Sequence, residues 1–139
     1  MKVVVAKTQK EITDNFYVRG MVFVVEQEID YEIEFDGLDG QCVLFVAYMD
    51  EKPVGAARLY QNKVGRVATL KDNRQQGVAS AIMTKIEDYA LVHDMKRLKL
   101  HAQLYIKDFY LKRGYIPEGD IFQEADIDHI KMTKEIKKS

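Results

Sequence analysis

The stretch RQQGVA, residues 74–79, joins a run of β-branched residues at 64–70 to a long helical pattern that begins at Gln76. It has the form of a turn that receives an anion, yet it lacks both the Gly-x-Gly-x-x-Gly fingerprint and the Gly-Lys-[Ser/Thr] of a P-loop. A helix N-terminus offers unpaired N–H groups and the positive end of the helix dipole, so phosphate can bind there without a special side chain. Gly77 allows close approach of the backbone, and Arg74 can contact phosphate oxygens. Taken alone, the hexapeptide is equally compatible with a plain helix start that contains a glycine.

The segments on both sides of this turn predict a mixed α/β fold. From Gln76 to Ala90, apolar residues recur at three- and four-residue spacing, which is the pattern of an amphipathic helix. Residues 105–113 predict a short helix that ends at Gly114, after which Tyr115 begins a strand as a packing residue. Apolar runs bounded by polar turns predict the other strands, which are 3–6, 42–49, 53–60, 63–70, 97–104 and 128–136.

A first helix is predicted near the N-terminus, where Thr8 and Glu11 fit a capping box. Its inner face is expected to be apolar and to consist of Ile12, Phe16 and Phe23. Arg19 lies near its end, and from 26 to 40 the periodicity fails and acidic residues accumulate, which predicts a loop with or without a helical turn. The predicted order βα(loop)βββαβαβ has crossovers that are long enough for parallel neighbouring strands.

The composition limits the classes of function. The 139 residues have the length of one domain, 1–139, which needs neither a metal nor a disulfide to fold. The 21 Lys and Arg nearly balance the 22 Asp and Glu, which argues against a nucleic-acid partner. Cys42 lies in an apolar run and is expected to be a small core residue rather than a nucleophile. We find no run of signal-peptide or membrane-spanning length and expect a cytoplasmic protein without a membrane partner.

A second stretch of the sequence indicates which kind of protein this turn belongs to. FYLKRGY, residues 109–115, lies beyond the next predicted strand, and together the two stretches resemble the Gcn5-related N-acetyltransferase (GNAT) superfamily. Members of that superfamily carry Arg/Gln-x-x-Gly-x-Gly/Ala after the fourth strand and a Phe-Tyr…Gly-Phe/Tyr segment after the fifth. A third stretch, residues 18–39, resembles the ElaA/YjcF-like branch, as does DHIKM at 128–132, in which Asp128 replaces a proline. The resemblance covers essentially the whole chain.

The resemblance implies both a fold and a cosubstrate. The fold would be α/β, with a mixed, mostly antiparallel central sheet, a splayed parallel strand pair and about four flanking helices. The cosubstrate would be acetyl-CoA, with its pyrophosphate on the turn and its pantetheine arm along a bulged edge of the strand at 63–70. The Val67 N–H would also polarise the thioester carbonyl. The implied contacts are Val67, Ala68, Thr69, Arg74, Gln75, Gln76, Gly77, Val78, Ala79 and Ser80.

Acyl transfer to an amine needs a base, an oxyanion donor and an acid for the departing thiolate. Tyr110 matches the phenol of the family's Phe-Tyr segment and is the implied acid; the alternative is a core aromatic residue beside Phe109. Two side chains are candidates for the base. Glu26 sits where the branch has its Glu-Gln, and His101 stands where the branch usually has Asn. An ordered water that relays the proton is a third possibility, and no metal is implied.

The sequence therefore predicts an N-acetyltransferase that moves the acetyl group of acetyl-CoA to a primary amine, by direct attack in a ternary complex. The acceptor would be a small molecule or an exposed amino group, and the acidic 26–40 loop favours a cationic one. The alternative is a non-catalytic acyl-CoA-binding or protein-interaction module on the same fold. Gln75 replaces a glycine that is frequent in the family and stiffens the turn. The identity of the acceptor stays open, as does a homodimer.

Overall fold

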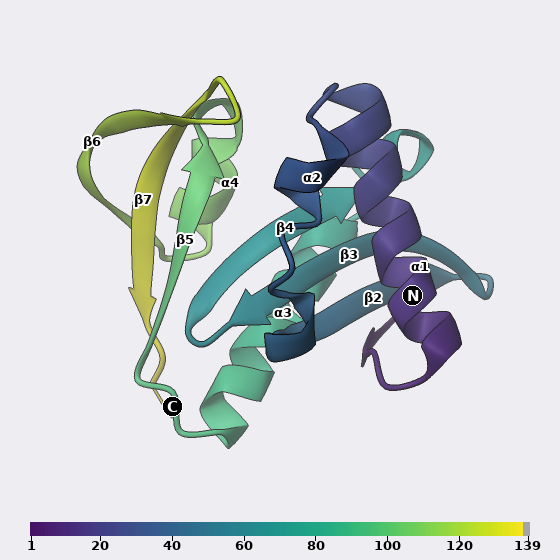
Figure 1. The fold of residues 1–139 in the computed structure, drawn as a ribbon. Helices are drawn as coiled ribbons and strands as arrows, with labels where there is room; N and C mark the ends of the chain where they lie inside the picture. The colour runs from purple at the N-terminus through teal and green to yellow at the C-terminus, as the bar shows by residue number, and fades with distance from the viewer. Residues whose placement is uncertain (138–139) are drawn as a thin grey trace.

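The computed structural model describes residues 1–137, in which the strands form a seven-stranded sheet with the order β1-β2-β3-β4-β5-β7-β6 (Figure 1). In chain order the elements are β1 (Lys2–Val5), α1 (Gln9–Arg19), the π-helical η1 (Gly20–Glu26), α2 (Tyr31–Glu34), the 3-10 turn η2 (Asp39–Gln41), β2 (Val43–Met49), β3 (Lys52–Tyr60), β4 (Lys63–Thr69), the 3-10 turn η3 (Lys71–Asn73), α3 (Val78–Val92), β5 (Arg97–Gln103), the 3-10 turn η4 (Leu104–Ile106), α4 (Lys107–Lys112), β6 (Ile116–Glu124) and β7 (Ile127–Glu135).

The sheet is antiparallel at every junction except the one between β4 and β5. These two strands are parallel and pair only at Lys63 with Lys99 and at Val64 with Leu100, beyond which they splay apart (Figure 1). The predicted mixed, mostly antiparallel sheet with one splayed parallel pair is therefore confirmed, with four α-helices beside it.

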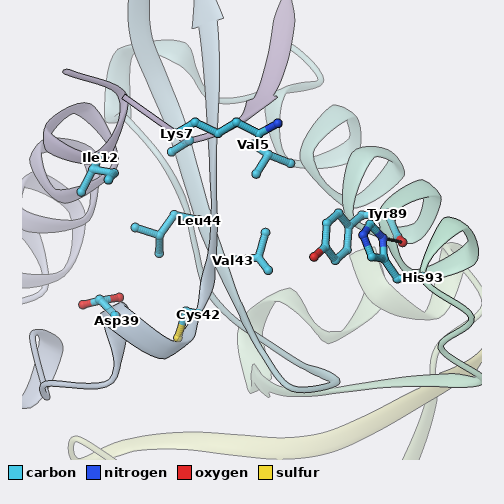
Figure 2. A pocket seen from close by; sticks show the side chains of 11 residues that line it. Val5, Lys7, Ile12, Asp39, Cys42, Val43, Leu44, Tyr89 and His93 are labelled. Carbon is cyan, nitrogen blue, oxygen red and sulfur yellow. Dashed lines mark hydrogen bonds between the residues drawn. The ribbon is translucent and has the colours of Figure 1, made fainter. Parts of the chain in front are cut away.

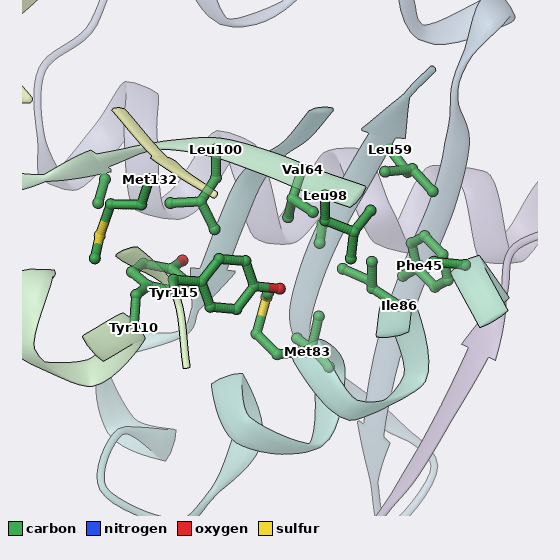
Figure 3. Close-up of a cluster of buried hydrophobic side chains, with 14 of the residues drawn as sticks. Phe45, Leu59, Val64, Met83, Ile86, Leu98, Leu100, Tyr110, Tyr115 and Met132 are labelled. Carbon is green, nitrogen blue, oxygen red and sulfur yellow. The ribbon is translucent and has the colours of Figure 1, made fainter. Parts of the chain in front are cut away.

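The face of the sheet under α3 carries the main apolar core. Figure 3 shows this cluster, which includes Phe45, Leu59, Val64, Met83, Ile86, Leu98, Leu100, Tyr110, Tyr115 and Met132. Close contact between α3 and the sheet depends on Gly55, because a Cβ there would lie 2.5 Å from Val78 and 2.8 Å from Ile82. At the same, N-terminal end of α3, Arg113 at the end of α4 donates to Ser80 and so joins α4 to the first turn of α3.

The opposite face of β2, β3 and β4 is covered by α1 (Figure 1). The predicted capping box of Thr8 and Glu11 is present. The predicted inner face is only partly correct, because Ile12 and Phe16 are half-buried while polar residues are fully buried. Phe23 is buried as expected, and the other buried residues of α1 and η1 are Asn15, Val18, Arg19 and Val22. The side-chain amide of Asn15 donates to backbone carbonyls of both β2 and β3, which explains a polar residue on this face.

One part of the predicted order is wrong. The predicted order counts one strand after α4, but β6 and β7 form a hairpin there, and β6 begins at Ile116 rather than at Tyr115. β6 is an edge strand that contains Pro117 and a bulge near Gly119, so it lacks the apolar run of an inner strand. The predicted loop at 26–40 does contain helical turns, the short helix α2 and the 3-10 turn η2. Among the described residues, every helix is too short or too polar to cross a membrane.

Candidate active site

A cavity of about 810 Å³ lies where β4 and β5 diverge. Its walls come from these two strands, from η1 and α2 on one side, from α4 on the other, and from the β6–β7 hairpin. Because the strands separate, the backbone groups of β4 that face β5 beyond Val64 have no strand partner. Such an edge can pair with an extended ligand that carries amide groups.

β4 is bulged at the point where the cavity begins. Its pairing with β3 shifts between Gly65 and Ala68, and Arg66 has a positive φ of 55°. The cavity is lined beyond the bulge by Val67, Ala68 and Thr69, which are the three strand residues expected to contact the cosubstrate. The bulge therefore turns the backbone of this predicted segment along the opening.

The turn before α3 presents unpaired N–H groups. Gln75 and Gly77 both have positive φ, and α3 begins at Val78. The first N–H of α3 with a backbone acceptor is that of Ala81, so the preceding N–H groups of Val78, Ala79 and Ser80 lack one among residues 1–137.

The side chains of this predicted turn differ in where they lie. Those that line the cavity are Arg74, Gln75 and Ala79. Val78 is instead 2% exposed in the core, so it could contact a ligand only through its backbone, while the Ser80 hydroxyl lies outside the cavity lining and accepts from Arg113 at 2.9 Å. Gln76 is exposed outside the cavity lining.

Two residues that were expected to have separate roles form an ion pair. Arg74 donates to both carboxylate oxygens of Glu26 at 2.6 and 2.7 Å and to the Thr69 carbonyl at 3.1 Å. These hydrogen bonds lower the pKa of Glu26, which weakens it as a proton acceptor. Glu26 is also absent from the cavity lining. Arg74 can contact a phosphate only by sharing or releasing this partner.

Tyr110 extends from α4 into the apolar wall of the cavity. It is 4% exposed and packs edge-on against Phe109 and Tyr115. Its hydroxyl has no hydrogen-bond partner within the described chain, whereas that of Tyr115 donates to Glu87 at 2.9 Å. Burial raises the pKa of Tyr110, so the phenol stays protonated at neutral pH and can donate.

His101 lies on β5 and also lines the cavity, where it has a carboxylate partner that the sequence did not reveal. Its Nδ1 is 2.6 Å from Glu124 Oε2, and Phe122 packs edge-on against its ring. The other oxygen of Glu124 is 3.9 Å from Nε2 of His129. The sequence could not identify Glu124 as the partner of His101, because the strand that carries Glu124, β6, was not in the predicted order.

Three carboxylates of the acidic 26–40 loop, Glu34, Asp36 and Asp39, are paired with arginines. Arg19 is fully buried and pairs with Glu34 and Asp39, both at 2.8 Å. Arg58 pairs with Asp36 at 2.8 Å, and Arg66 at the β4 bulge contacts Glu34 at 3.1 Å and Asp36 at 3.4 Å. We call these six residues the arginine–carboxylate network: Arg19, Glu34, Asp36, Asp39, Arg58 and Arg66.

Burial and pairing shift the pKa values of the carboxylates of this network in opposite directions. Hydrogen bonds from Arg58 hold the pKa of Asp36 well below its usual range, while burial raises the pKa of Glu34. The three carboxylates face three guanidinium groups, so their charges no longer favour a cationic acceptor. The network instead fixes α2 against the bulge, and therefore one wall of the cavity.

A second cavity of about 620 Å³ lies at the far side of the sheet, between β1, α1, β2 and the end of α3. Figure 2 shows its lining, in which the His93 ring stacks on Tyr89 and Cys42 projects from the start of β2. Cys42 is half-buried and its thiol donates to the Leu38 carbonyl; burial raises the pKa of that thiol. A thiol with a raised pKa is a poor nucleophile, in keeping with the expected packing role.

Comparisons with known proteins agree with this geometry. The profile of the family described as "Acetyltransferase (GNAT) domain" matches residues 8–136. The chain is 38% identical to YjcF of Bacillus subtilis, named an uncharacterized N-acetyltransferase, over 97% of this chain and 100% of that protein. It is 30% identical to the Escherichia coli protein ElaA, over 86% and 84% of the two chains. The crystal structure of an acyl-CoA N-acyltransferase from Pseudomonas aeruginosa has a TM-score of 0.84 and 28% identity, covering 96% and 97% of the two chains.

Proposed function

Since the chain belongs to the GNAT acetyltransferase family, we propose that it transfers the acetyl group of acetyl-CoA to a primary amine. The observation that carries the proposal is the meeting, in one cavity, of three features that this reaction needs. They are an unpaired strand edge, a helix N-terminus and a protonated phenol. The comparisons support acyl transfer in general, and acetyl as the acyl group is our proposal.

The donor would bind along the diverging edge of β4. Its pyrophosphate would accept from the free N–H groups at the start of α3, where the helix dipole favours an anion. The amide groups of the pantetheine arm would pair with the backbone of Val67–Thr69, as an added strand does. The thioester carbonyl would then lie near the bulge, where the Val67 N–H can stabilise the developing oxyanion.

The reaction then needs two proton transfers. The amine loses a proton and its nitrogen attacks the thioester carbon, which gives a tetrahedral intermediate with a negative oxygen. When the intermediate collapses, the C–S bond breaks and the departing thiolate takes a proton. Tyr110 is suited to give that proton, because its hydroxyl has no other partner among residues 1–137 and burial keeps it protonated.

We assign the base to His101 rather than to Glu26. His101 lines the cavity, and Glu124 can hold its Nδ1 proton so that Nε2 is left to accept one from the amine. Glu26 has a lowered pKa, is held by Arg74 and lies outside the cavity lining. Histidine is the side chain that most often serves as a general base in enzymes.

The proposal is tested by Tyr110→Phe, which removes the hydroxyl and keeps the ring. Free thiol released from acetyl-CoA is measured with a panel of primary amines, together with CoA affinity by calorimetry. We expect kcat to fall by about 10²- to 10⁴-fold, as for the loss of a general acid, with little change in CoA affinity. Tyr115→Phe is the matched control, because it removes a neighbouring hydroxyl that binds Glu87. It should lower stability and leave kcat close to that of the unchanged protein.

Two results would oppose the proposal. If Tyr110→Phe retains full kcat, the phenol only packs, and the thiolate leaves without it. If no amine releases thiol although CoA binds in the cavity, the chain is a non-catalytic acyl-CoA-binding module.

A further inference from the structure

The cavity contains a lysine whose position points to the chemistry of the acceptor. Lys63 begins β4 and lines the cavity, and it is in register with Tyr60 of β3 and Lys99 of β5. Cross-strand partners share a face of the sheet, and so does the residue two positions further along a strand. His101 is two positions beyond Lys99, so Lys63 and His101 lie on the same face.

Lys63 differs from the other cations of the cavity in having no counter-ion. Arg58 and Arg66 both pair with carboxylates of the arginine–carboxylate network. Lys63 has no carboxylate within 4.0 Å in the described part of the chain, although its side chain is partly buried. A buried cation without a partner is unfavourable, and an anionic ligand would relieve this cost.

The electrostatic surroundings of Lys63 support this conclusion. Burial is the main cause that lowers its pKa, and the positive charges of Arg66, Arg58 and Lys99 act in the same direction. The negative charge of Glu124 acts in the opposite direction, but this carboxylate is already bound to His101. A ligand carboxylate would favour the charged ammonium form and restore an ordinary pKa.

The two ends of the acceptor would therefore meet different groups. An amine near His101 and Glu124 would face a proton acceptor and a carboxylate, while the neighbouring Lys63 offers an ammonium group to an anion. The two carboxylates of the 26–40 loop that line the cavity, Glu34 and Asp36, are poorly placed to attract a second positive charge, because arginines already pair with them. This arrangement disfavours a polyamine and suits a zwitterion.

We propose that the acceptor is an amine that also carries a carboxylate, such as an amino acid, and that Lys63 binds this carboxylate. The inference rests on the acyl-transfer function proposed above and specifies its substrate class. The carboxylate takes no part in bond formation; its pairing with Lys63 orients the amine toward the thioester. Lys63 is thus a specificity-determining residue rather than a proton carrier.

The test compares binding of matched ligands to the protein saturated with CoA. Calorimetry measures the affinity of phenylalanine against phenethylamine, and of lysine against 1,5-diaminopentane; within each pair only the carboxylate is lost. We expect the carboxylate to raise affinity at least tenfold in the unchanged protein and to have almost no effect in Lys63→Gln. Lys99→Gln is the matched control, because Lys99 is on the same face but outside the cavity lining, and it should retain the preference.

Equal affinities within each pair would overturn the inference, as would a preference that survives in Lys63→Gln or disappears equally in Lys99→Gln. Thiol release from acetyl-CoA with the same ligands is read separately. If amino acids bind through Lys63 but release no thiol, the anion site stands and the acyl-transfer proposal fails. If amines without a carboxylate bind and react as well as amino acids, acyl transfer stands and the role of Lys63 fails.

Discussion

The two faces of the sheet are attached to their helices by different forces. Under α3, the contact is almost entirely apolar, and the side chains of Ile82, Met83 and Ile86 are fully buried against β2–β5. Under α1, the apolar cluster is small, and its buried members are Val18, Val22, Phe23, Ala56 and Ala68. The remaining contacts on that face come from Asn15 and from the arginine–carboxylate network.

The apolar contacts and the charged contacts contribute to the cavity in two different ways. Apolar packing is insensitive to pH and salt, and it holds α3 close to the sheet, where the N-terminus of α3 is expected to bind the donor. The charged contacts contribute less to net stability, since desolvation opposes them, but they fix geometry. They place α2 against the β4 bulge and so shape the acceptor side of the cavity. Removing a charged contact should therefore cost stability in a pH-dependent way, whereas removing an apolar contact should cost the same at every pH.

The largest effect is expected from Arg19→Met on the charged face. The change leaves Glu34, whose side chain is 3% exposed, and Asp39 without their main partner. Removing one partner of a buried ion pair costs about 3–5 kcal/mol in the free energy of unfolding. Burial already raises the pKa of Glu34, and the loss of Arg19 raises it further, so protonation relieves the cost as pH falls. Urea unfolding should show a larger loss at pH 7 than at pH 5.

Ile86→Ala on the apolar face is the control for this variant. It removes a fully buried side chain and should cost about 2–5 kcal/mol through lost burial and a cavity. That loss should be the same at pH 7 and pH 5, because no titrating group is involved. If the loss in Arg19→Met is equally independent of pH, the two faces do not differ in the way we describe.

A smaller effect is expected from Asp36→Asn, at the border of the network with solvent. Asp36 accepts two hydrogen bonds from Arg58, and its side chain is 30% exposed. The loss should be about 1–2 kcal/mol near neutral pH, as for hydrogen bonds to a charged group that is partly solvated. Because Arg58 lowers the pKa of Asp36, this stability is present above the unfolded pKa, about 3.8–3.9, and disappears as pH falls through the folded value.

The measurement is the difference in urea midpoint between Asp36→Asn and the unchanged protein at pH 6 and at pH 3. We expect the difference to shrink at pH 3. Asp88→Asn on the exposed side of α3 is the matched control and should change stability by less than about 0.5 kcal/mol. A difference between Asp36→Asn and the unchanged protein that is as large at pH 3 as at pH 6 would show that Asp36 acts through its shape and not through its charge.

The apolar face was also the more predictable of the two from sequence. Periodicity identifies α3, and the two stretches around RQQGVA and FYLKRGY place the turn and Tyr110 at one cavity. Local patterns suffice there because burial repeats with the period of the helix. On the charged face, the polar residues Asn15 and Arg19 are buried because of partners far along the chain, such as Ala57 and Asp39.

The same reason explains what sequence reasoning missed in the cavity. Lys63 and Glu124 look like ordinary charged residues in the sequence, because their significance depends on which strands become neighbours. The pairing of Lys63 with Lys99 places Lys63 on the same sheet face as His101, and the β6–β7 hairpin brings Glu124 to His101. Similarly, the pairing of Glu26 with Arg74 joins residues that lie on separate elements, which no local pattern can indicate.

The smallest effect on stability is expected from breaking the ion pair between Glu26 of η1 and Arg74 before α3, which lies where the two faces meet. Both side chains are more than a third exposed, at 35% for Glu26 and 40% for Arg74, so Glu26→Gln should change the free energy of unfolding by less than about 1 kcal/mol. Its effect on CoA affinity should be clearer. If Arg74 must release Glu26 to contact a phosphate, removing the carboxylate should tighten CoA binding about two- to fivefold. Arg74→Gln should weaken it, and both changes should diminish at high salt. Weaker CoA binding by Glu26→Gln in calorimetry would mean instead that Glu26 orients Arg74 for the ligand, and the charged face would then contribute to the donor site as well.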